Sequence, residues 1–584
     1  MNIPSELKKM LNGSLGATKQ KAARLVIDLA SSAGATEFIK CSDAHVSGVS
    51  PLTGGHGLRR FLKDLAGDKN ASVEIPTTLN SAGCDWEKMD EMDIQEDNFL
   101  KHQFEIIQSY SQLGIKTTLS CTPYDRGKEI EGVGSWAESN AVAFSNSYTS
   151  LITNRESGLS ALSTAITGWA PKWGLHIEKN RIPNIEVDVE CELNDIVDWS
   201  ILGDWIGKQI QPEWNLPWGV MPHIFGKFDQ VSFEEKKALT AAAANYGCPM
   251  LWIDGVTDEP VLSATWKPQA KLHFTEYELK KRYSELAPTG QVDLVVIGCP
   301  QASLGEVRST AEAVKKRMDI GERITNHRLW VFTSGDNHQL LKEEGTLQVL
   351  EEAGALILKD TCPEVTPYNR KKYNHLLTNS LKAEHYLTSG LNRIPTSVMK
   401  IADCVNHAFE PSLSEGEYPI LTEKSNQQNP TNKTHKEGKL ESYGKGLPSQ
   451  QTWNVKGRAL VTDVPITYLG YVNRDTGVIE EPGHPLDGKS IEDTILIYPK
   501  GSGSTVAPFV LMGLIYTGKG PKAIINNDVC PLTLPACSML NIPYAFAMSD
   551  DLCMEINTDD VIEMSLIDGK VSVKILKRNS EVFS

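Results

Sequence analysis

The sequence predicts a multi-domain α/β protein, and three observations support this prediction. The chain has 584 residues, whereas a single hydrophobic core rarely extends beyond about 250–300 residues. Up to about residue 410, helical patterns alternate with short apolar runs, which is typical of βαβ units in a largely parallel, layered structure. The composition then changes twice. We therefore expect a large multi-layer part over 1–410, a linker over 411–453 and a smaller C-terminal β/α domain over 454–584.

Hydrophobic periodicity locates individual elements in the large part. Apolar residues at helical spacing predict helices at Ala22–Ser32, Phe99–Leu113 and Phe233–Asn245. Short apolar runs predict strands, and these are "KTTLS" (116–120), "MLWI" (250–253), "DLVVIG" (293–298), "LWVFTS" (329–334) and "ALIL" (355–358).

The two changes of composition define the rest of the chain. The segment that begins "PSLSEGEYPILTEKSNQQNPTNK" at Pro411 is rich in Ser, Asn, Lys, Gly and Pro, as linkers are. From about Val455 onward, short β-rich runs such as "TILIYP" and "VSVKIL" are divided by Gly and Pro turns. These runs predict a compact C-terminal domain of strands and helices.

Charge and hydropathy exclude several classes of protein. The net charge of −16 argues against a general nucleic-acid binder, because phosphate neutralisation needs a basic surface. A small anionic substrate remains compatible, since its site needs only local cations or amides. No stretch approaches the roughly 18 uncharged apolar residues that would span a bilayer, and the N-terminus has no signal-peptide core. We expect a cytoplasmic protein with no membrane or nucleic-acid partner.

Three of the eleven cysteines share a local pattern. In "TTLSCTP", "LVVIGCPQ" and "LILKDTCPE", an apolar run ends at Cys121, Cys299 or Cys362, and proline follows at the next position or the one after. Ligands of open α/β sheets bind beyond the carboxyl ends of strands, so strands of one sheet would bring these thiolates to a common edge. Thiolates are the usual ligands of iron–sulfur clusters, and proline helps to fix a loop around them.

An alternative interpretation is that these cysteines are small buried hydrophobes. The Cys-Pro pairs Cys248-Pro249 and Cys530-Pro531 come before or between apolar runs, and we interpret them as structural. The same interpretation applies to Cys41, Cys84, Cys191, Cys404, Cys537 and Cys553. The chain has no CxxC pair, so spacing alone leaves both interpretations open.

Other polar motifs resemble the catalytic part of the aconitase X family, a branch of the aconitase superfamily. They occur in the family's order along residues 1–405 and are "KCSDAHVSGVSPLTGG" (40–55), "IPTTLNSAGCDW" (75–86), "SCTPY" (120–124), "WAESNAVAFSNS" (136–147), "TNRESG" (153–158), "IGCPQASLGE" (297–306), "DTCPEV" (360–365) and "TNSLKAEHY" (378–386). The C-terminal "GHPLDGKS" (483–490) and "GSGSTVAPFVL" (501–511) resemble the family's small swivel domain. The resemblance implies an aconitase-like fold with a swivelling C-terminal domain.

The resemblance also implies an activity, that of a hydro-lyase with an iron–sulfur cluster. Cys121, Cys299 and Cys362 match the family's cluster ligands, which leaves an iron position open for a hydroxyl group. The cluster type stays open between 2Fe–2S, 3Fe–4S and 4Fe–4S. Because both parts are joined in one chain, the sequence resembles the family's cis-3-hydroxy-L-proline dehydratases, which form 1-pyrroline-2-carboxylate.

Three alternatives remain. The first is a mevalonate 5-phosphate dehydratase, the enzyme that the two-subunit members of the family resemble. The second is a non-catalytic iron or redox-sensing protein on the same fold. A zinc site is weaker, because no histidine lies within a few residues of Cys121, Cys299 or Cys362.

In the swivel domain, Ser504 of "GSGST" matches the family's catalytic serine. A serine hydroxyl is a weak base and needs an activating environment. Its Gly-rich turn precedes an apolar helix whose backbone N–H groups can stabilise an oxyanion. The alternative is that Ser504 or Thr505 only caps that helix.

Substrate-binding residues come from separate loops. Gly48, Val49 and Ser50 match a stretch whose amides can approach a carboxylate closely, and Asn80 and Ser81 match a second loop. Lys382 is expected to neutralise the substrate carboxylate, and His45 to act as an acid or hydrogen-bond donor. The alternatives are an ordinary Gly/Ser loop, a solvated lysine and a buried structural histidine. A further polar set is expected to support the cluster loops, namely Glu138, Ser139, Asn146, Arg155 and Glu156.

Overall fold

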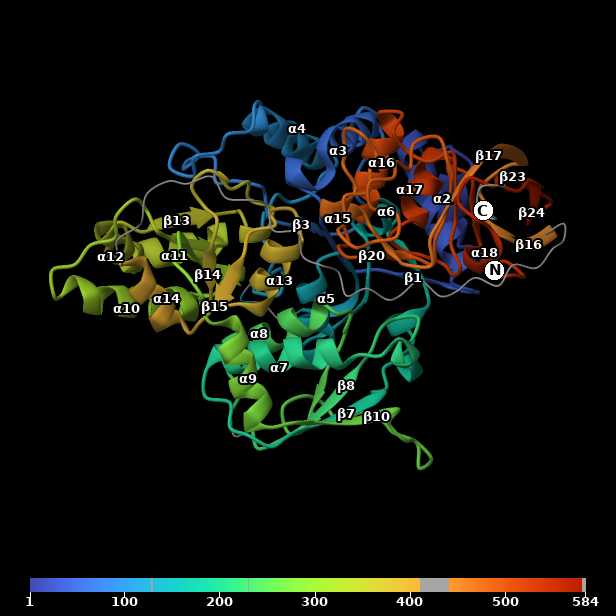
Figure 1. Cartoon of the computed structure of the whole chain (residues 1–584). Coiled ribbons are helices and arrows are strands. Elements are labelled where there is room, and N and C mark those ends of the chain that lie inside the picture. Colours follow the sequence, from blue (N-terminus) through green and yellow to red (C-terminus); the bar gives the residue numbers. More distant parts are fainter. Residues whose placement is uncertain (126, 128–129, 229, 410–440, 580–584) are drawn as a thin grey trace.

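The computed structural model describes residues 1–125, 127, 130–228, 230–409 and 441–579, and it confirms the predicted α/β class (Figure 1). Within these residues, the large part holds three parallel sheets, each defined by its strand order, and a two-stranded antiparallel sheet of β1 (Phe38–Lys40) and β6 (Trp169–Pro171). The first is β3 (Thr77–Leu79), β2 (Asp43–Val46), β4 (Glu131–Trp136) and β5 (Ser150–Arg155). The second is β10 (Ala270–Phe274), β7 (Ile185–Val189), β8 (Pro222–Phe225) and β9 (Trp252–Ile253). The third is β13 (Leu356–Lys359), β12 (Leu329–Thr333), β11 (Leu294–Ala302), β14 (Leu376–Thr378) and β15 (Thr396–Val398). Neighbouring strands in these three sheets run parallel.

Helices connect and cover these sheets. Around the first sheet lie α1 (Ser5–Leu11), α2 (Ala17–Ser32), α3 (Pro51–Ala66), α4 (Phe99–Gln112), α5 (Ser139–Tyr148) and α6 (Gly158–Thr167). In the second sheet, β7 is followed along the chain by α7 (Ile196–Gln209), β8 by α8 (Phe233–Ala244) and β10 by α9 (Glu276–Leu286). The third has α10 (Leu304–Met318), α11 (Gly335–Glu343), α12 (Thr346–Ala353), α13 (Leu381–Ser389) and α14 (Ile401–Ala408). Within the described ranges, no helix combines the length and the apolar character needed to cross a bilayer.

The predicted helices are confirmed as α2, α4 and α8, with α2 beginning at Ala17 rather than Ala22. Capping explains where two of the helices begin. Ser232 and Glu235 form a capping box at the start of α8, and Ser303 and Glu306 form another at the start of α10. In each box, side chains satisfy backbone N–H groups that the first helical turn leaves without partners.

Two predicted strands differ from the structure. The range 116–120 forms only an isolated bridge between Lys116 and Thr78 instead of a strand. At Thr118 the side-chain hydroxyl takes over the pairing, since it donates to Leu79 O (2.9 Å) and accepts from Leu79 N–H (3.0 Å). The strand predicted at 293–298 does not stop before Cys299. It continues as β11 to Ala302, with a register shift between Ile297 and Ala302.

The C-terminal region forms a closed barrel with the strand order β16 (Glu441–Gly446), β22 (Tyr544–Phe546), β21 (Ala523–Ile525), β19 (Ile495–Ile497), β17 (Trp453–Val461), β23 (Val561–Ile567) and β24 (Lys570–Lys577). Its main helices are α16 (Ala507–Tyr516) and α17 (Leu534–Leu540). Strand β16 comes from the range expected to be linker, and 411–440 lie outside the described residues. The boundaries of the catalytic part and the C-terminal domain stay predictions.

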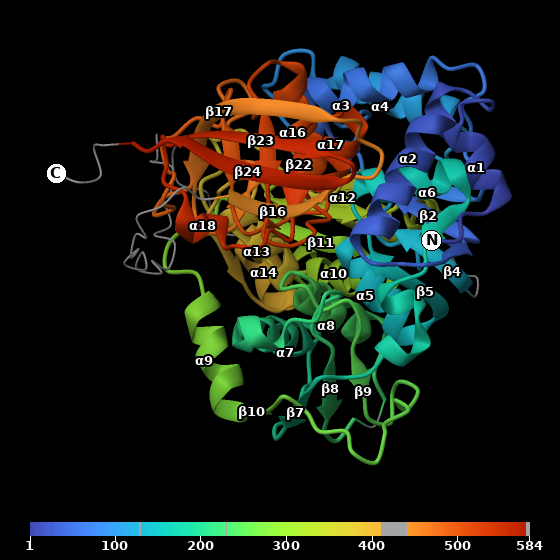
Figure 2. The same cartoon turned by 90° about the vertical axis from the view of Figure 1, so that its right-hand side faces the viewer.

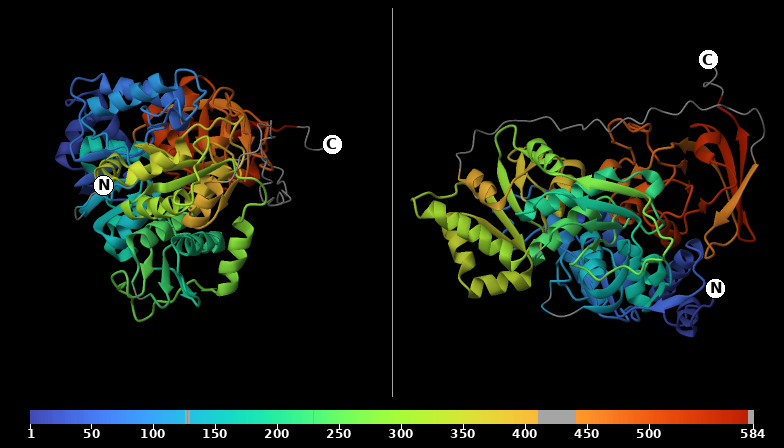
Figure 3. Two further views of the ribbon diagram at one scale, coloured as in Figure 1. Left: turned by 90° about the vertical axis from the view of Figure 1, so that its left-hand side faces the viewer. Right: turned by 90° about the horizontal axis from the view of Figure 1, so that it is seen from below.

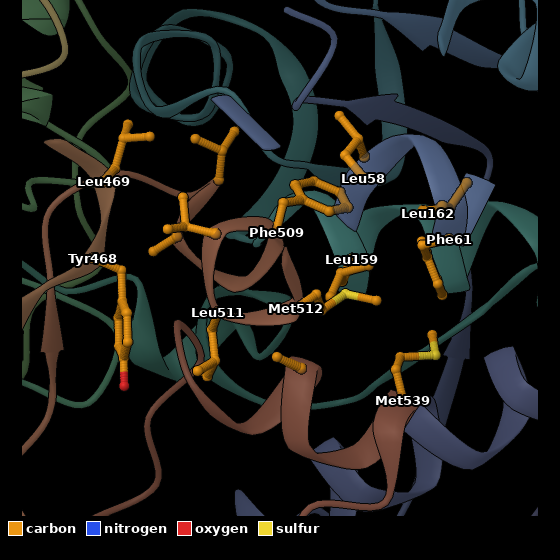
Figure 4. Close-up of a cluster of buried hydrophobic side chains, with 14 of the residues drawn as sticks. Leu58, Phe61, Leu159, Leu162, Tyr468, Leu469, Phe509, Leu511, Met512 and Met539 are labelled. Atoms are coloured by element: carbon orange, nitrogen blue, oxygen red, sulfur yellow. The ribbon is translucent and has the colours of Figure 1, made fainter. Parts of the chain in front are cut away.

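The barrel and the N-terminal helices share one hydrophobic core. In Figures 1 and 2 the orange and red barrel lies beside the blue N-terminal helices, and Figure 3 (right) places the third sheet at the opposite end of the molecule. Figure 4 shows Phe509 and Met512 of α16 facing Leu58 of α3 and Leu159 of α6. This packing brings the loop before α16 to the carboxyl ends of the strands in the large part.

Candidate active site

One pocket lies where the first sheet, the third sheet and the barrel meet. Its wall comes from the loops after β2 and β3, from β11, from the loop after β13, from α13 and from the loop before α16. The lining residues include Ser47, Gly48, Val49, Ser50, Thr53, Asn80, Ser81, Cys121, Glu138, Cys299, Cys362, Glu364, Lys382, Tyr386, Leu469, Ser504 and Thr505. The pocket therefore brings together every residue predicted for the site except His45.

The sulfur atoms of Cys121, Cys299 and Cys362 converge at one end of the pocket. The thiols of Cys121 and Cys299 are each hydrogen-bonded to that of Cys362. The cysteines are 4–5% exposed, and the Cys299 and Cys362 sulfurs lie within 4.8 Å of each other and of a Glu364 carboxylate oxygen. The structure thus brings together the cysteines that the sequence pattern singled out.

The expectation that these cysteines come from strands of one sheet is wrong. Cys121 follows the loop beside β3 of the first sheet, whereas Cys299 lies in β11 and Cys362 follows β13 of the third sheet. The two sheets meet at their carboxyl ends, where Ala82 pairs with Thr361 and its N–H donates to Asp360 O at 2.9 Å. The common edge is therefore an interface between two sheets.

The chemistry of these side chains fits a soft, thiolate-preferring group. Burial raises the pKa of the Cys299 thiol to about 12. The hydrogen bond with Cys362, together with burial, holds the pKa of Cys121 well above its usual value. Thiols of this kind stay protonated until a metal displaces their protons. Three buried sulfurs are the donor set that an iron–sulfur cluster prefers.

A buried ion-pair network lies directly beside the cysteines, where the Cys299 thiol donates to Glu364 Oε1 at 3.1 Å. Lys382 Nζ lies 2.6 Å from Glu138 Oε1 and 3.8 Å from Glu364 Oε1. Burial opposes the charged forms of Lys382 and Glu138, but their mutual attraction outweighs it, raising the pKa of the lysine and lowering that of Glu138. Burial raises the pKa of Glu364. With 3% exposure, Lys382 is not the solvated helix lysine of the alternative interpretation.

The two predicted substrate loops are held in place by hydrogen bonds to the residues around them. Ser50 begins α3 and its Oγ donates to Val365 O at 2.9 Å, while Asn80 Nδ2 donates to Glu138 Oε2 at 2.8 Å. The buried Oγ atoms of Ser47 and Ser81 have no hydrogen-bond partner among the described residues. Because buried polar groups are normally paired, these hydroxyls fit a role in binding a polar ligand.

His45 does not line the pocket. It lies fully buried in β2, where its Nδ1 is 2.9 Å from Thr78 Oγ1 and its ring meets Trp136 edge-on. Successive side chains of a strand point to opposite faces, and this one points into the sheet's packing. The structure therefore does not bring His45 together with the other predicted site residues.

Ser504 faces the pocket from the barrel side, in the loop between β20 (Gly501–Ser502) and α16. Its Oγ accepts a long hydrogen bond from Val506 N–H (3.4 Å), and no side chain caps α16. Ser504 therefore lies both beside the start of α16 and on the wall of the pocket. Thr505 O accepts from Gly158 N–H of α6 at 3.1 Å, which ties the serine loop to the large part.

Some lining residues were not predicted from the sequence. Glu364 lies two residues after Cys362, and Tyr386 lies one helical turn after Lys382, so both were visible as neighbours of predicted residues. Glu138 was expected to support the loops from behind but lines the pocket itself.

Comparisons with known proteins identify the family. Family models described as the aconitase X first, second, third and swivel domains match residues 1–179, 183–284, 292–410 and 450–573. The chain belongs to the aconitase X family. The recognised resemblance is therefore confirmed.

Relatives of this aconitase X are named dehydratases. The phosphomevalonate dehydratase large subunit of Methanosarcina mazei is 32% identical over 416 residues, which is 70% of this chain and 97% of that protein. The cis-3-hydroxy-L-proline dehydratase of Pseudomonas aeruginosa is 29% identical over 421 residues, which is 68% of each chain. A solved structure of Thermococcus kodakaraensis aconitase X in its holo-form has a TM-score of 0.62 and 30% identity, covering 69% of this chain and 99% of that one. The chain is accordingly a hydro-lyase.

Proposed function

We propose that this aconitase X dehydrates cis-3-hydroxy-L-proline to 1-pyrroline-2-carboxylate with the help of an iron–sulfur cluster. The observation that carries the proposal is the charge of the pocket. Among the described lining residues, the side chains with formal charge are Glu138, Glu364 and Lys382, and the lysine is already paired with both carboxylates. An amino acid substrate carries one ammonium and one carboxylate, so it matches a wall with both signs of charge.

In this proposal, Lys382 binds the carboxylate of the substrate. Glu138 and Glu364 accept hydrogen bonds from the ammonium group of the substrate. Ser47 and Ser81 offer hydroxyls that lack partners among the described residues. Together these groups hold the α-carbon toward Ser504 and keep bulk water from the reacting atoms.

Ser504 takes the α-proton. The start of α16 lies beside its Oγ, with Val506 N–H at 3.4 Å, and the positive end of the helix dipole favours the ionised hydroxyl. Cys121, Cys299 and Cys362 would hold the cluster, which supplies a Lewis acid for the departing hydroxide when bound. Loss of the α-proton and the 3-hydroxyl leaves an enamine, and its tautomer is the cyclic imine product.

A second candidate substrate is mevalonate 5-phosphate. It is favoured by sequence identity, which is 29–34% for the archaeal phosphomevalonate dehydratase large subunits and 28–29% for the cis-3-hydroxy-L-proline dehydratases. This substrate carries a phosphate in addition to a carboxylate and would need a further cation, which the described lining residues do not provide.

The test is a parallel assay of anaerobically purified protein with both substrates. The proposal expects kcat/KM for cis-3-hydroxy-L-proline to exceed that for mevalonate 5-phosphate by at least about 100-fold, the effect of roughly 3 kcal/mol in transition-state binding. A preference for mevalonate 5-phosphate would replace the proposal by the second candidate.

A further inference from the structure

Gln301 bridges the segments that carry all three cysteines. It follows Cys299-Pro300 directly in β11 and is 1% exposed. Its side-chain Oε1 accepts from Cys121 N–H at 3.2 Å. Its Nε2 donates to Leu119 O at 3.2 Å and to Thr361 O at 3.0 Å. One amide therefore joins Cys121 and the segment just before it to the residue immediately before Cys362.

The backbone of Gln301 adds a contact to a cysteine sulfur. Its N–H donates to Cys121 Sγ at 3.3 Å. The backbone N–H of Gln301 thus fixes the position of the Cys121 sulfur, and its side-chain amide fixes the path of the loop that carries Cys121.

Lys237 of α8 fixes Gln301 from behind. This lysine is 2% exposed and its Nζ donates to Gln301 O at 2.9 Å and Pro300 O at 3.2 Å. It also forms an ion pair with the buried Glu306 carboxylate, which in turn accepts from Ser303 N–H at 2.9 Å. Carbonyls held by a buried, paired ammonium have little freedom to shift, so the Cys299-Pro300-Gln301 segment has a rigid support.

We propose that Gln301, supported by Lys237, is a positioning residue that assembles the three thiols into a preformed site before any group is bound. The inference rests on the ligand set of the proposed function but is independent of the substrate. Residues that orient ligands from behind typically change metal affinity by about 10–100-fold when they are replaced. Gln301 has the particular feature that a single side chain contacts segments from two sheets.

The test compares Gln301→Leu with Asn184→Leu as a matched control. Asn184 is also a buried amide, which accepts from Met221 N–H (2.7 Å) and donates to Trp214 O (2.7 Å) and Gln269 Oε1 (3.0 Å) in the second sheet region. Both replacements remove comparable hydrogen bonds, and the Asn184 contacts include none of the three cysteines. Thermal unfolding of both variants measures the shared structural cost.

The first readout is the rate at which a chelator removes the visible absorption of the loaded protein. We expect this rate to rise by about 10–100-fold in Gln301→Leu and by less than about twofold in Asn184→Leu, at similar melting temperatures. Equal rates in wild type and Gln301→Leu would overturn the inference, as would equal acceleration in both variants.

The second readout uses cluster-free protein, so it separates this inference from the proposed function. Arsenite, whose As(III) centre binds three thiolates together, is titrated into the apoprotein and followed by its sulfur-to-arsenic absorption. Weaker binding by about 10-fold or more in Gln301→Leu supports the inference even if hydroxyproline is not the substrate. Unchanged arsenite affinity would overturn it.

A second variant approaches the same segment through Lys237. The double replacement Lys237→Met with Glu306→Gln removes the ion pair without leaving a buried charge alone. We expect it to accelerate cluster loss in the same direction as Gln301→Leu, and it carries the test if Gln301→Leu does not fold. A loss rate equal to that of wild type would contradict the proposed role of Lys237.

Discussion

Gly48 of the substrate loop packs directly against the ring of Phe509 in α16. A Cβ placed on Gly48 would lie 2.4 Å from Phe509 Cε2, and the residue has a φ of +92°. The contact joins the large part to the barrel at the pocket, because Gly48 and Ser504 line the same cavity. Only glycine fits here, for both steric and conformational reasons.

Replacing Gly48 with alanine is therefore expected to lower activity by more than the unfavourable backbone conformation alone would. Gly34 is the control, since it has a φ of +70° but no atom within 4 Å of a built Cβ. Both variants bear the conformational cost of about 1–2 kcal/mol, but only Gly48→Ala must also displace Phe509. We expect kcat/KM to fall at least about 10-fold in Gly48→Ala and to stay within about twofold in Gly34→Ala. Equal activity in the two variants would show that the contact does not position the loop.

Ser504→Ala tests the proposed base. Removal of a positioned general base typically lowers kcat by about 10²–10⁴-fold. The iron content and visible spectrum should not change, since Ser504 is not among the cysteine ligands. Ser502→Ala, two residues away on β20, is expected to retain near-normal kcat. A Ser504→Ala variant with wild-type kcat would require another base.

For the ion pair of Lys382 and Glu138, we expect a second replacement to restore stability but not activity. Lys382→Met leaves two buried carboxylates without their cation, a change expected to lower the free energy of unfolding by about 3–5 kcal/mol. The double variant Lys382→Met with Glu138→Gln should recover much of this loss in urea denaturation. Activity should stay low in both variants, because the substrate carboxylate has lost its cation. Recovery of activity in the double variant would contradict the role given to Lys382.

Asp28 predicts a pH dependence at the contact between α2 and the barrel region. Its carboxylate accepts from Ser449 N–H (2.9 Å) and from the hydroxyls of Ser449 and Ser538 (both 2.5 Å). Burial raises its pKa from 3.8 to about 6, although these hydrogen bonds lower it.

Because the folded protein holds the Asp28 proton more tightly than the unfolded chain, this group makes the protein less stable as the pH rises from about 4 to about 6. The free energy of unfolding of wild type relative to Asp28→Asn is expected to increase by about 2 kcal/mol when the pH falls from 7 to 4. Urea denaturation of both proteins at several pH values measures the difference. A difference that does not vary with pH would show that Asp28 does not titrate in this range.

The sequence predicted the cysteines because their pattern is local. An apolar run that leads into Cys299 or Cys362 can be recognised from its own few residues, and so can a Gly-rich turn before Ser504. The helices α2, α4 and α8 were predicted for the same reason, since helical periodicity is a local property.

Relationships between distant segments were not visible. That Cys121 belongs to a different sheet from Cys299 depends on how two sheets pack, which no single segment encodes. Gln301 acts through Leu119 and Thr361, which are about 180 and 60 residues away in the chain. The position of His45 away from the pocket wall was not visible either, because the neighbouring motif does not show which face of β2 points to the pocket.

The most direct test of the account is the iron and acid-labile sulfide content of four cysteine-to-serine variants purified without oxygen. Cys121, Cys299 and Cys362 form the proposed ligand set, and Cys248 is the control, since it is also buried and also precedes a proline. The account predicts that wild type and Cys248→Ser contain iron and sulfide and absorb visible light, whereas each of the other variants loses most of its iron and its activity. A wild-type protein that is colourless and free of iron yet active, or a Cys299→Ser variant with the iron content of Cys248→Ser, would contradict it.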